Sequence, residues 1–258
     1  MSTKAMIELV VLGSGTAIPS ARRRSSGYLL QTGRSCILVE SGPGTMQAIA
    51  RAGYDFHDID AIFYSHLHVD HTASLAQFLF ASRLPDDPRT KALLIAGPPG
   101  TGQLLDGFRE LYTPWLEPET FKLEVREISH GSFDFIDWNI GCLPVEHTDN
   151  ALAYRFEHES GKVIAYSGDS DYCENLVRIA RGADIALLEC SYPDGMKVRG
   201  HLTPSLAGKV AREAGCGKLV LTHFYPPCDE VDVVAGAKSE YPGEVIRAED
   251  NMTIEVTG

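Results

Sequence analysis

Short runs of apolar residues, separated by small and polar residues, recur along the first half of the chain. Runs of about four to eight apolar residues are typical of strands that are buried on both faces. They predict strands over residues 7–12, 35–40, 59–64 and 92–96. Apolar residues at helical spacing, as at Leu75, Phe78, Leu79 and Leu84, follow the third strand and predict a helix there. Further helices are predicted over residues 45–52 and 103–112.

The second half of the chain combines hairpins with strand-helix units. Gly161-Lys162 is typical of a hairpin turn between strands 152–157 and 162–166, within a region of several strands from residue 121 to residue 166. Helices are predicted over residues 172–181 and 204–214, and strands over 184–189 and 218–222. Together these units indicate mixed sheets with helices outside them, an α/β layered architecture. No long linker interrupts the pattern, which predicts a single domain over residues 1–258.

The charge balance argues against a surface that binds nucleic acid non-specifically. The chain has 23 basic and 35 acidic residues and a formal net charge of −12, whereas proteins that bind polyanions usually carry a basic face. The one basic run is Arg22-Arg23-Arg24. A solvated loop is the simpler interpretation of this run, and guidance of a phosphate-bearing substrate is the alternative.

Cysteine spacing and hydropathy indicate a cytoplasmic protein. The six cysteines include no CxxC pair, so neither a zinc knuckle nor a disulfide framework is suggested, and a reducing compartment fits best. No stretch approaches the roughly 20 apolar residues that a membrane span requires. We therefore expect no membrane association.

The segment His66-Leu67-His68-Val69-Asp70-His71 directly follows an apolar strand. An HxHxDH pattern arises by chance in roughly one sequence in a thousand of this composition. His66 and His68 lie two residues apart on an extended turn, so both side chains can point toward one metal ion. Asp70 and His71 turn round as the next helix begins and can face a second ion. The segment predicts a two-metal site, and a solvated polar loop is the alternative.

With this motif the chain resembles the metallo-β-lactamase superfamily over nearly its whole length. The resemblance implies a four-layer αββα sandwich of two mixed β-sheets with helices on both outer faces. It also implies later ligands at strand ends, two divalent ions per chain, and a homodimer. By this resemblance, His66, His68 and His147 hold one ion, Asp70, His71 and His223 hold the other, and Asp169 bridges them. Nitrogen and carboxylate ligands without thiolate favour Zn²⁺, with Mn²⁺ or iron as alternatives.

Three further segments are similar to ribonuclease Z-type enzymes. They are the opening Leu12-Gly13-Ser14-Gly15-Thr16, Gly200-His201-Leu202-Thr203-Pro204 and Leu221-Thr222-His223-Phe224. The match implies that His201 lies beside the ions without binding them, and we predict that it donates a proton to the departing oxygen. Glu189, at a strand end, is a candidate to orient His201, and Asp70 is counted with them as catalytic. The alternatives are a surface histidine that caps a helix and a solvated carboxylate.

Two departures from ribonuclease Z shift the expected substrate. Only the 21 residues from 148 to 168 separate His147 from Asp169, which leaves no room for the arm that grips transfer RNA in that family. After His223 the chain continues with Phe224-Tyr225-Pro226, where the family commonly has a serine and an arginine. Together with the acidic balance, these departures favour a small phosphodiester or nucleotide-type substrate.

We therefore predict a metal-dependent hydrolase, a phosphodiesterase in which a hydroxide bound by two divalent ions attacks phosphorus. Cleavage of transfer RNA at its 3′ side by a ribonuclease Z is the first alternative, and it is disfavoured. Hydrolysis of another ester, a lactone, a sulfate ester or an amide is the second, because one fold hosts many chemistries. A metal-binding module without enzymatic activity is the third, but every expected ligand position is filled.

Overall fold

Residues 6–256 are described by the structure, a computed structural model in which two seven-stranded mixed sheets face each other. The first sheet has the order β14-β1-β2-β3-β4-β5-β6. It is antiparallel from β14 to β3 and parallel from β3 to β6. Its strands are β1 (Glu8–Gly13), β2 (Gly27–Gln31), β3 (Cys36–Val39), β4 (Ala61–Phe63), β5 (Leu93–Gly97), β6 (Leu123–Glu127) and β14 (Thr253–Glu255).

The second sheet has the order β13-β12-β11-β10-β9-β8-β7. It is antiparallel from β7 to β10 and parallel from β10 to β13. Because parallel strands end at the same edge, the loops that follow them gather there. The strands of this sheet are β7 (Gly131–Phe135), β8 (Trp138–Pro144), β9 (Leu152–His158), β10 (Val163–Tyr166), β11 (Ile185–Glu189), β12 (Lys218–Thr222) and β13 (Glu244–Arg247).

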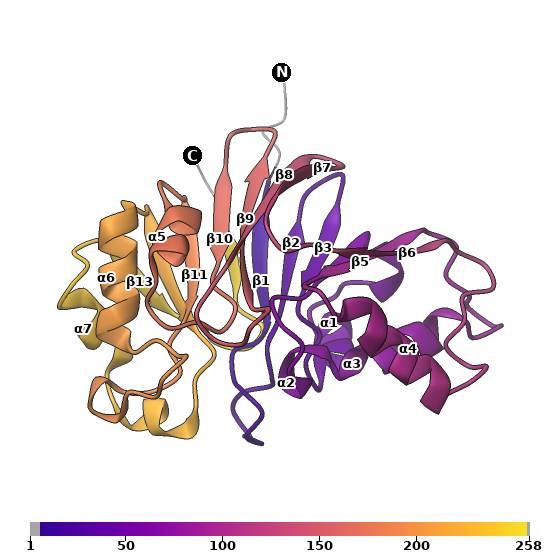
Figure 1. Cartoon of the computed structure of the whole chain (residues 1–258), viewed down its shortest axis with the longest axis horizontal. Coiled ribbons are helices and arrows are strands. Elements are labelled where there is room, and N and C mark those ends of the chain that lie inside the picture. Colours follow the sequence, from indigo (N-terminus) through magenta and orange to yellow (C-terminus); the bar gives the residue numbers. More distant parts are fainter. Residues whose placement is uncertain (1–5, 257–258) are drawn as a thin grey trace.

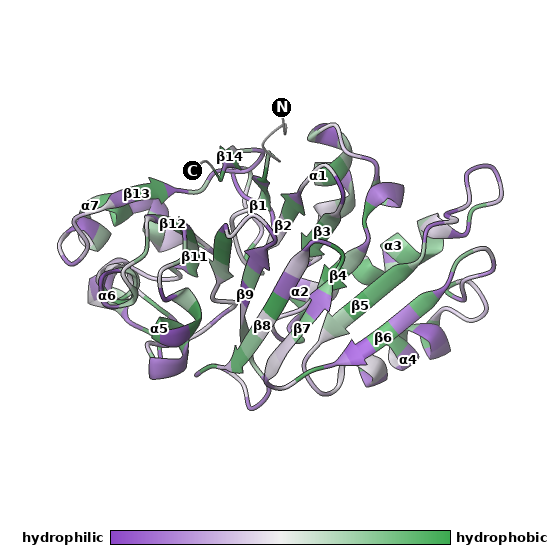
Figure 2. Ribbon diagram, turned by 90° about the horizontal axis from the view of Figure 1, so that it is seen from above, coloured by the Kyte–Doolittle hydropathy of each residue, from purple (hydrophilic) through white to green (hydrophobic). Residues whose placement is uncertain are grey.

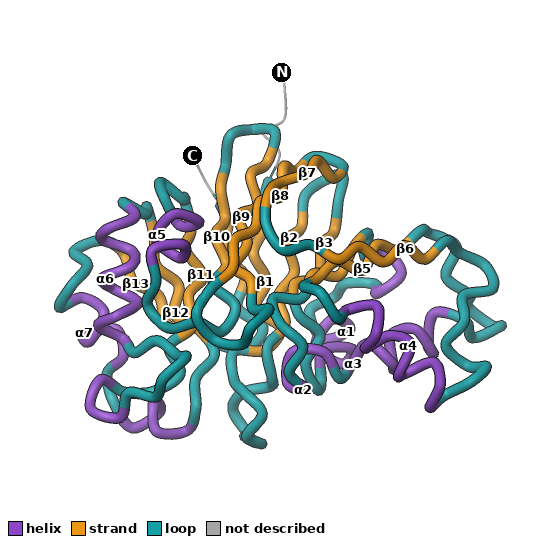
Figure 3. The backbone as a smooth tube through the Cα atoms, viewed as in Figure 1, coloured by secondary structure: helices purple, strands orange, loops and turns teal. Residues whose placement is uncertain are grey.

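Helices cover the outer face of each sheet, so the layers run helix, sheet, sheet, helix (Figures 1 and 3). On the first sheet lie α1 (Thr45–Arg51), α3 (Ser74–Ser82) and α4 (Thr101–Leu111), and the short helix α2 (Val69–Thr72) directly precedes α3. On the second lie α5 (Glu174–Ala180), α6 (Pro204–Ala214) and α7 (Val233–Lys238). The expected four-layer αββα sandwich is confirmed. Within residues 6–256 no helix is long and apolar enough to cross a membrane.

The continuous apolar runs are explained by burial on both faces of each sheet. In β1, Leu9 and Val11 point between the sheets, whereas Val10 and Leu12 point toward the helices, as alternation along a strand requires. The inner strand β5 is correspondingly hydrophobic, while its neighbour β6, at the edge of the sheet, is largely hydrophilic (Figure 2). A polar edge strand suits a position that pairs on one side only.

The elements predicted between residues 7 and 222 are present, with boundaries that differ by at most two residues. Four elements were not predicted, namely β2, α7, β13 and β14. Three of these are short or half exposed, and therefore lack the long apolar runs that reveal buried strands. Because β14 pairs with β1, the two ends of the described chain lie in one sheet. The single domain over residues 1–258 stays a prediction, which this pairing supports.

Candidate metal centre

The seven predicted metal-binding histidines and aspartates, from the first motif and from the strand ends, meet at one edge of the sandwich. His66 and His68 lie on the extended segment after β4, and His68 itself precedes the first residue of α2. Asp70 and His71 lie in α2 and are buried. The other three ligands come from loops that follow β8, β10 and β12, namely His147, Asp169 and His223. Strand ends therefore bring together residues that are far apart in the sequence.

The first group of side chains consists of His66, His68, His147 and Asp169, whose ligand atoms all lie within 4.8 Å of one another. His68 Nδ1 lies 3.0 Å from His66 Nε2 and 3.3 Å from His147 Nε2. Asp169 Oδ2 lies 3.8 Å from His66 Nε2 and 3.7 Å from His147 Nε2. Ring nitrogens and a carboxylate that converge in this way are suited to hold a cation at their centre.

The second group consists of Asp70, His71 and His223, and its ligand atoms also lie within 4.8 Å of one another. The Nε2 atoms of His71 and His223 are 3.3 Å apart, and Asp70 Oδ2 lies 3.8 Å from the former and 3.6 Å from the latter. Asp169 Oδ1 lies 3.4 Å from each of these two nitrogens. Asp169 therefore presents one oxygen to each group, which is the geometry of a bridging carboxylate.

Two observations support the fit of cations to these groups. Asp169 Oδ1 is buried and has no hydrogen-bond partner among the described residues, which is costly unless another ligand satisfies it. Burial would lower the pKa of His71, but the carboxylates of Asp169 and Glu40 outweigh it and raise that pKa well above its usual range. In the protein alone, a proton on His71 thus offsets negative charge that bound cations would otherwise neutralise.

The remaining charges in the cluster also suit metal binding. Burial alone would raise the pKa of Asp169, but the nearby rings of His223, His71 and His66 hold it well below its usual range. Burial and the charge of His71 lower the pKa of His66 well below its usual range. Asp169 is therefore ionised and His66 neutral, the protonation states in which carboxylates and imidazoles bind metals.

In three of the ligand histidines, His66, His147 and His223, the ring nitrogen that faces away from the cluster has a fixed neighbour. Ser65 Oγ lies 3.0 Å from His66 Nδ1, the Gly200 carbonyl accepts from His147 Nδ1 at 2.9 Å, and Ser191 Oγ lies 3.0 Å from His223 Nδ1. Such contacts fix the ring orientation and leave Nε2 facing the cluster. Sequence reasoning missed these contributors, because no motif marks a serine or a backbone carbonyl that contacts a distant histidine.

Glu40 is a further buried acid that the sequence did not single out. Its Oε1 lies 3.6 Å from His71 Nδ1 and accepts a hydrogen bond from the Ser65 backbone at 3.0 Å. Gly42, two residues later, allows this loop to approach α2, because a Cβ there would lie 2.1 Å from the carbonyl oxygen of Asp70. A carboxylate at a strand end before a Ser-Gly turn was the only signal available in the sequence.

His201 and Glu189 form a buried pair beside the first group. His201 Nδ1 lies 3.0 Å from Glu189 Oε1 and 3.2 Å from Ser191 Oγ. Glu189 is 1% exposed and also accepts from the Ser170 backbone at 2.7 Å, so the interpretation as a solvated carboxylate is wrong. His201 is 9% exposed and is not a surface histidine. It also groups with Asp169 and His223, but its Nδ1 is held by Glu189, which leaves Nε2 as the outward nitrogen.

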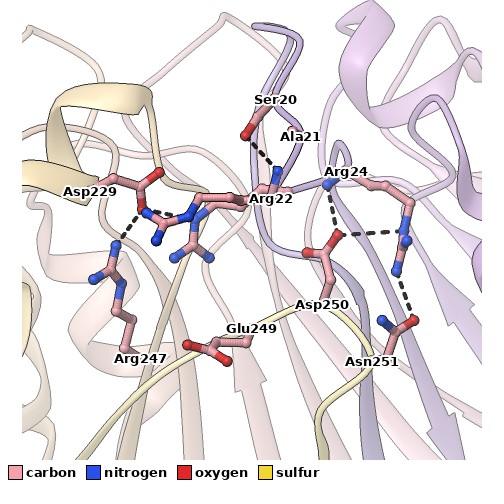
Figure 4. Close-up of a pocket in the computed structure, with 10 residues that line it drawn as sticks. Ser20, Ala21, Arg22, Arg24, Asp229, Arg247, Glu249, Asp250 and Asn251 are labelled. Atoms are coloured by element: carbon pink, nitrogen blue, oxygen red, sulfur yellow. Dashed lines mark hydrogen bonds and ion pairs between the residues drawn. The ribbon is translucent and has the colours of Figure 1, made fainter.

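The interpretation of Arg22-Arg23-Arg24 as a solvated loop is correct only for Arg22, which is exposed. Arg23 is paired with Asp229 at 3.3 Å. Arg24 is paired with Asp250 at 3.4 Å (Figure 4). Together with Arg247, which also pairs with Asp229, they line a polar cavity of about 490 Å³. These contacts connect the N-terminal loop to the C-terminal segment. Because Arg23 and Arg24 are paired with carboxylates, their charges are not free to guide a phosphate.

Comparisons with known proteins agree with this geometry. A family model described as "Beta-lactamase superfamily domain" matches residues 36–224. Ribonuclease Z of Mycobacterium sp. (strain KMS) is 30% identical over 277 residues, which cover 97% of this chain and 96% of that protein. The metallo-β-lactamase fold protein YhfI of Bacillus subtilis is 25% identical, with a TM-score of 0.83 and coverage of 98% of this chain and 100% of that one.

The short form of human tRNase Z has the same fold, with a TM-score of 0.81, 24% identity and coverage of 97% of this chain and 100% of that one. The family match, the relatives and the histidine and aspartate cluster together imply a requirement for divalent metal ions. The chain therefore belongs to the metallo-β-lactamase superfamily, as a ribonuclease Z-like hydrolase.

Proposed function

We propose that the protein hydrolyses a compact phosphodiester with two divalent ions, held by the groups described above. The observation that carries this proposal is the position of Asp169, whose two oxygens approach two different sets of histidines. His66, His68 and His147 would hold one ion, Asp70, His71 and His223 the other, and Asp169 both. Ions bound there would supply an activated water molecule and stabilise negative charge on the phosphoryl oxygens.

His201 is the proposed proton donor to the departing oxygen. Burial would lower its pKa, but the hydrogen bond and charge of Glu189 outweigh burial and raise that pKa. A raised pKa keeps the ring protonated nearer neutral pH, as a general acid requires. Since Glu189 accepts from Nδ1, the proton on Nε2 is the one available to the substrate. Glu189 is thus proposed to orient His201 and to stabilise its charge.

The relative named ribonuclease Z supports cleavage of a phosphodiester bond. Two further observations support a compact substrate. The interval between His147 and Asp169 is occupied by the hairpin of β9 and β10 and its connections, so no arm is present at that place. The net charge of −12 opposes the binding of a large polyanion. The names of the relatives nevertheless make 3′ processing of transfer RNA the second candidate.

The identity of the metal and the oligomeric state are two further proposals. Imidazole and carboxylate ligands without thiolate favour Zn²⁺, and Mn²⁺ or iron would also accept this ligand set. We further propose a cytoplasmic homodimer. Sedimentation analysis of the purified protein would test the dimer, and a single species with the mass of one chain would contradict it.

A hydrolysis panel tests the proposed function. The purified protein would be supplied with Zn²⁺ or Mn²⁺ and offered bis-aryl phosphodiesters, cyclic nucleotides, precursor transfer RNA, lactones and aryl sulfates. We expect the highest kcat/KM on a compact phosphodiester. Preference for a lactone or sulfate ester would contradict the assigned bond, and preference for precursor transfer RNA would favour the second candidate.

A further inference from the structure

Two tyrosines that the mechanism above does not use lie stacked beside His201. The ring centroids of Tyr192 and Tyr225 are 4.6 Å apart, and their planes are inclined by 15°. Their rings lie 6.0 Å and 6.2 Å, respectively, from the His201 ring. Tyr225 also lies 6.0 Å from the His223 ring. Neither tyrosine belongs to the proposed metal ligands or to the proposed proton donor.

The pair is held in place by the backbone. The Tyr225 amide donates to the Ser191 carbonyl, which directly precedes Tyr192, at 3.2 Å, and the Cys228 amide donates to the Tyr225 carbonyl at 2.9 Å. Both tyrosines are partly exposed, so their rings remain accessible. Burial and the neighbouring Tyr192 raise the pKa of Tyr225, and the ring therefore stays neutral. The result is a fixed aromatic surface beside His201 and His223.

The position of this surface relates it to the departing group. His201 Nδ1 faces Glu189, so a leaving oxygen that takes a proton from His201 lies on the Nε2 side. The rings around His201 are His147, His223, Tyr192 and Tyr225. Since the two histidines face the metal groups, the tyrosines are the aromatic neighbours left to contact whatever is attached to the leaving oxygen. Aromatic surfaces of this kind stack on planar rings regardless of their hydrogen-bonding pattern.

We propose that Tyr192 and Tyr225 bind a planar aromatic leaving group, so that the substrate is a phosphodiester of a nucleoside or an aryl alcohol. This inference rests on the proposed function. Stacking acts on the substrate before and during the reaction, and it therefore lowers KM without changing kcat.

Matched substrates separate stacking from leaving-group chemistry. One pair is a nucleoside 5′-phosphodiester and its analogue without the base, and the other is a phenyl and a hexafluoroisopropyl phosphodiester, whose leaving alcohols are similarly acidic. We expect Tyr225→Leu and Tyr192→Leu to lower kcat/KM about tenfold on the aromatic members, through KM, and to leave the other members nearly unchanged. The first pair reports on a nucleobase and the second on an aryl ring. Tyr225→Phe should retain wild-type behaviour because it keeps the ring.

Tyr112→Leu removes another partly exposed tyrosine, at the end of α4, and serves as the control. Equal losses on both members of each pair, or a loss in kcat alone, would overturn the stacking role. Unchanged KM for both aromatic members in the leucine variants would do the same. If the wild-type protein hydrolysed none of the four phosphodiesters, the proposed function itself would fail, which is a different result.

Discussion

The metal centre depends on which nitrogen of each histidine faces inward. Ser65, Gly200 and Ser191 contact the outward nitrogens of three ligand histidines, while Glu189 contacts His201. Loss of such partners typically costs about 10-fold to 100-fold in metal affinity or activity. The proposed arrangement therefore separates two tasks among chemically identical side chains. Some rings would bind cations, and His201 would carry a proton.

Asp169→Ala should remove metal from both groups, since one oxygen of this side chain faces each group. We expect bound metal, measured by elemental analysis, to fall for both sites and kcat/KM to fall by at least about 100-fold. Asp149→Ala, which removes an exposed carboxylate from the loop after His147, is the matched control. Two ions per chain in the Asp169 variant would show that this residue does not bridge.

His201→Ala should keep its metals but lose activity according to the leaving group. We expect nearly normal hydrolysis of a nitrophenyl ester, whose anion is stable, and a loss of about 10²-fold to 10⁴-fold on an alkyl or nucleoside ester. His130→Ala, at an exposed position, is the control histidine. A slope of log kcat against leaving-group pKa that is the same in variant and wild type would rule out proton donation by His201.

The chemistry-bearing residues were largely predictable because they lie in motifs or at strand ends. His66, His68, Asp70 and His71 are adjacent in the sequence, and the structure brings His147, Asp169 and His223 to them. Glu40 and Ser191 could not be found in this way. Their contacts with His71 and His223 span 31 and 32 residues, respectively, and only the packed sheets define those distances.

Among the elements, the buried strands other than β2 were predictable, whereas the edge strands β13 and β14 were not. Strands buried on both faces are apolar at nearly every position, as in β5 and in residues 185–188 of β11, and such runs are visible in the sequence. The edge strands β13 and β14 contact the core on one side only, so their residues alternate or remain polar. They are strands because they pair with β12 and β1, respectively. Pairing with a strand that is distant in the sequence produces no recognisable pattern in the residues of β13 and β14 themselves.

A buried polar cluster between the turns of the two sheets allows a prediction about stability. Asp137, between β7 and β8, accepts from Ser35 Oγ at 2.5 Å and Thr32 Oγ1 at 2.7 Å, both in the turn between β2 and β3. His158 Nε2 lies 3.3 Å from the same carboxylate. We expect Asp137→Ala to reduce the free energy of unfolding by roughly 1–3 kcal/mol, because the two hydroxyl donors lose their acceptor. Denaturant unfolding would measure this difference.

The carboxylate of Asp137 also makes the stability difference between wild type and Asp137→Ala depend on pH. Burial would raise the pKa of Asp137, but the hydrogen bonds from Ser35 and Thr32 outweigh burial and lower it. A lowered folded-state pKa means that the stabilisation is complete above the unfolded pKa, about 4, and is lost as pH falls through the folded value. The gap between wild type and Asp137→Ala should therefore shrink in acid. A gap that is constant from neutral pH to strongly acidic pH would contradict this account.

The whole molecule carries a net charge of −12 and has no arm between His147 and Asp169. We therefore expect slow cleavage of precursor transfer RNA that weakens roughly tenfold or more between about 50 and 200 mM salt. Cleavage of a compact phosphodiester should change little over the same range, which makes it the internal control. Tight, site-specific 3′ processing at physiological salt would show that another surface recognises the RNA.

The central claim is that two metal ions, held by the two histidine and aspartate groups, enable phosphodiester hydrolysis. The most direct test is to strip the protein with a chelator, restore Zn²⁺ or Mn²⁺ in steps, and measure bound metal, thermal stability and hydrolysis of a bis-aryl phosphodiester in each sample. We predict that activity rises with occupancy up to two ions per chain, and that melting temperature rises with it, since metal binds the folded state. Full activity in the stripped protein, or saturation at one ion, would contradict the account.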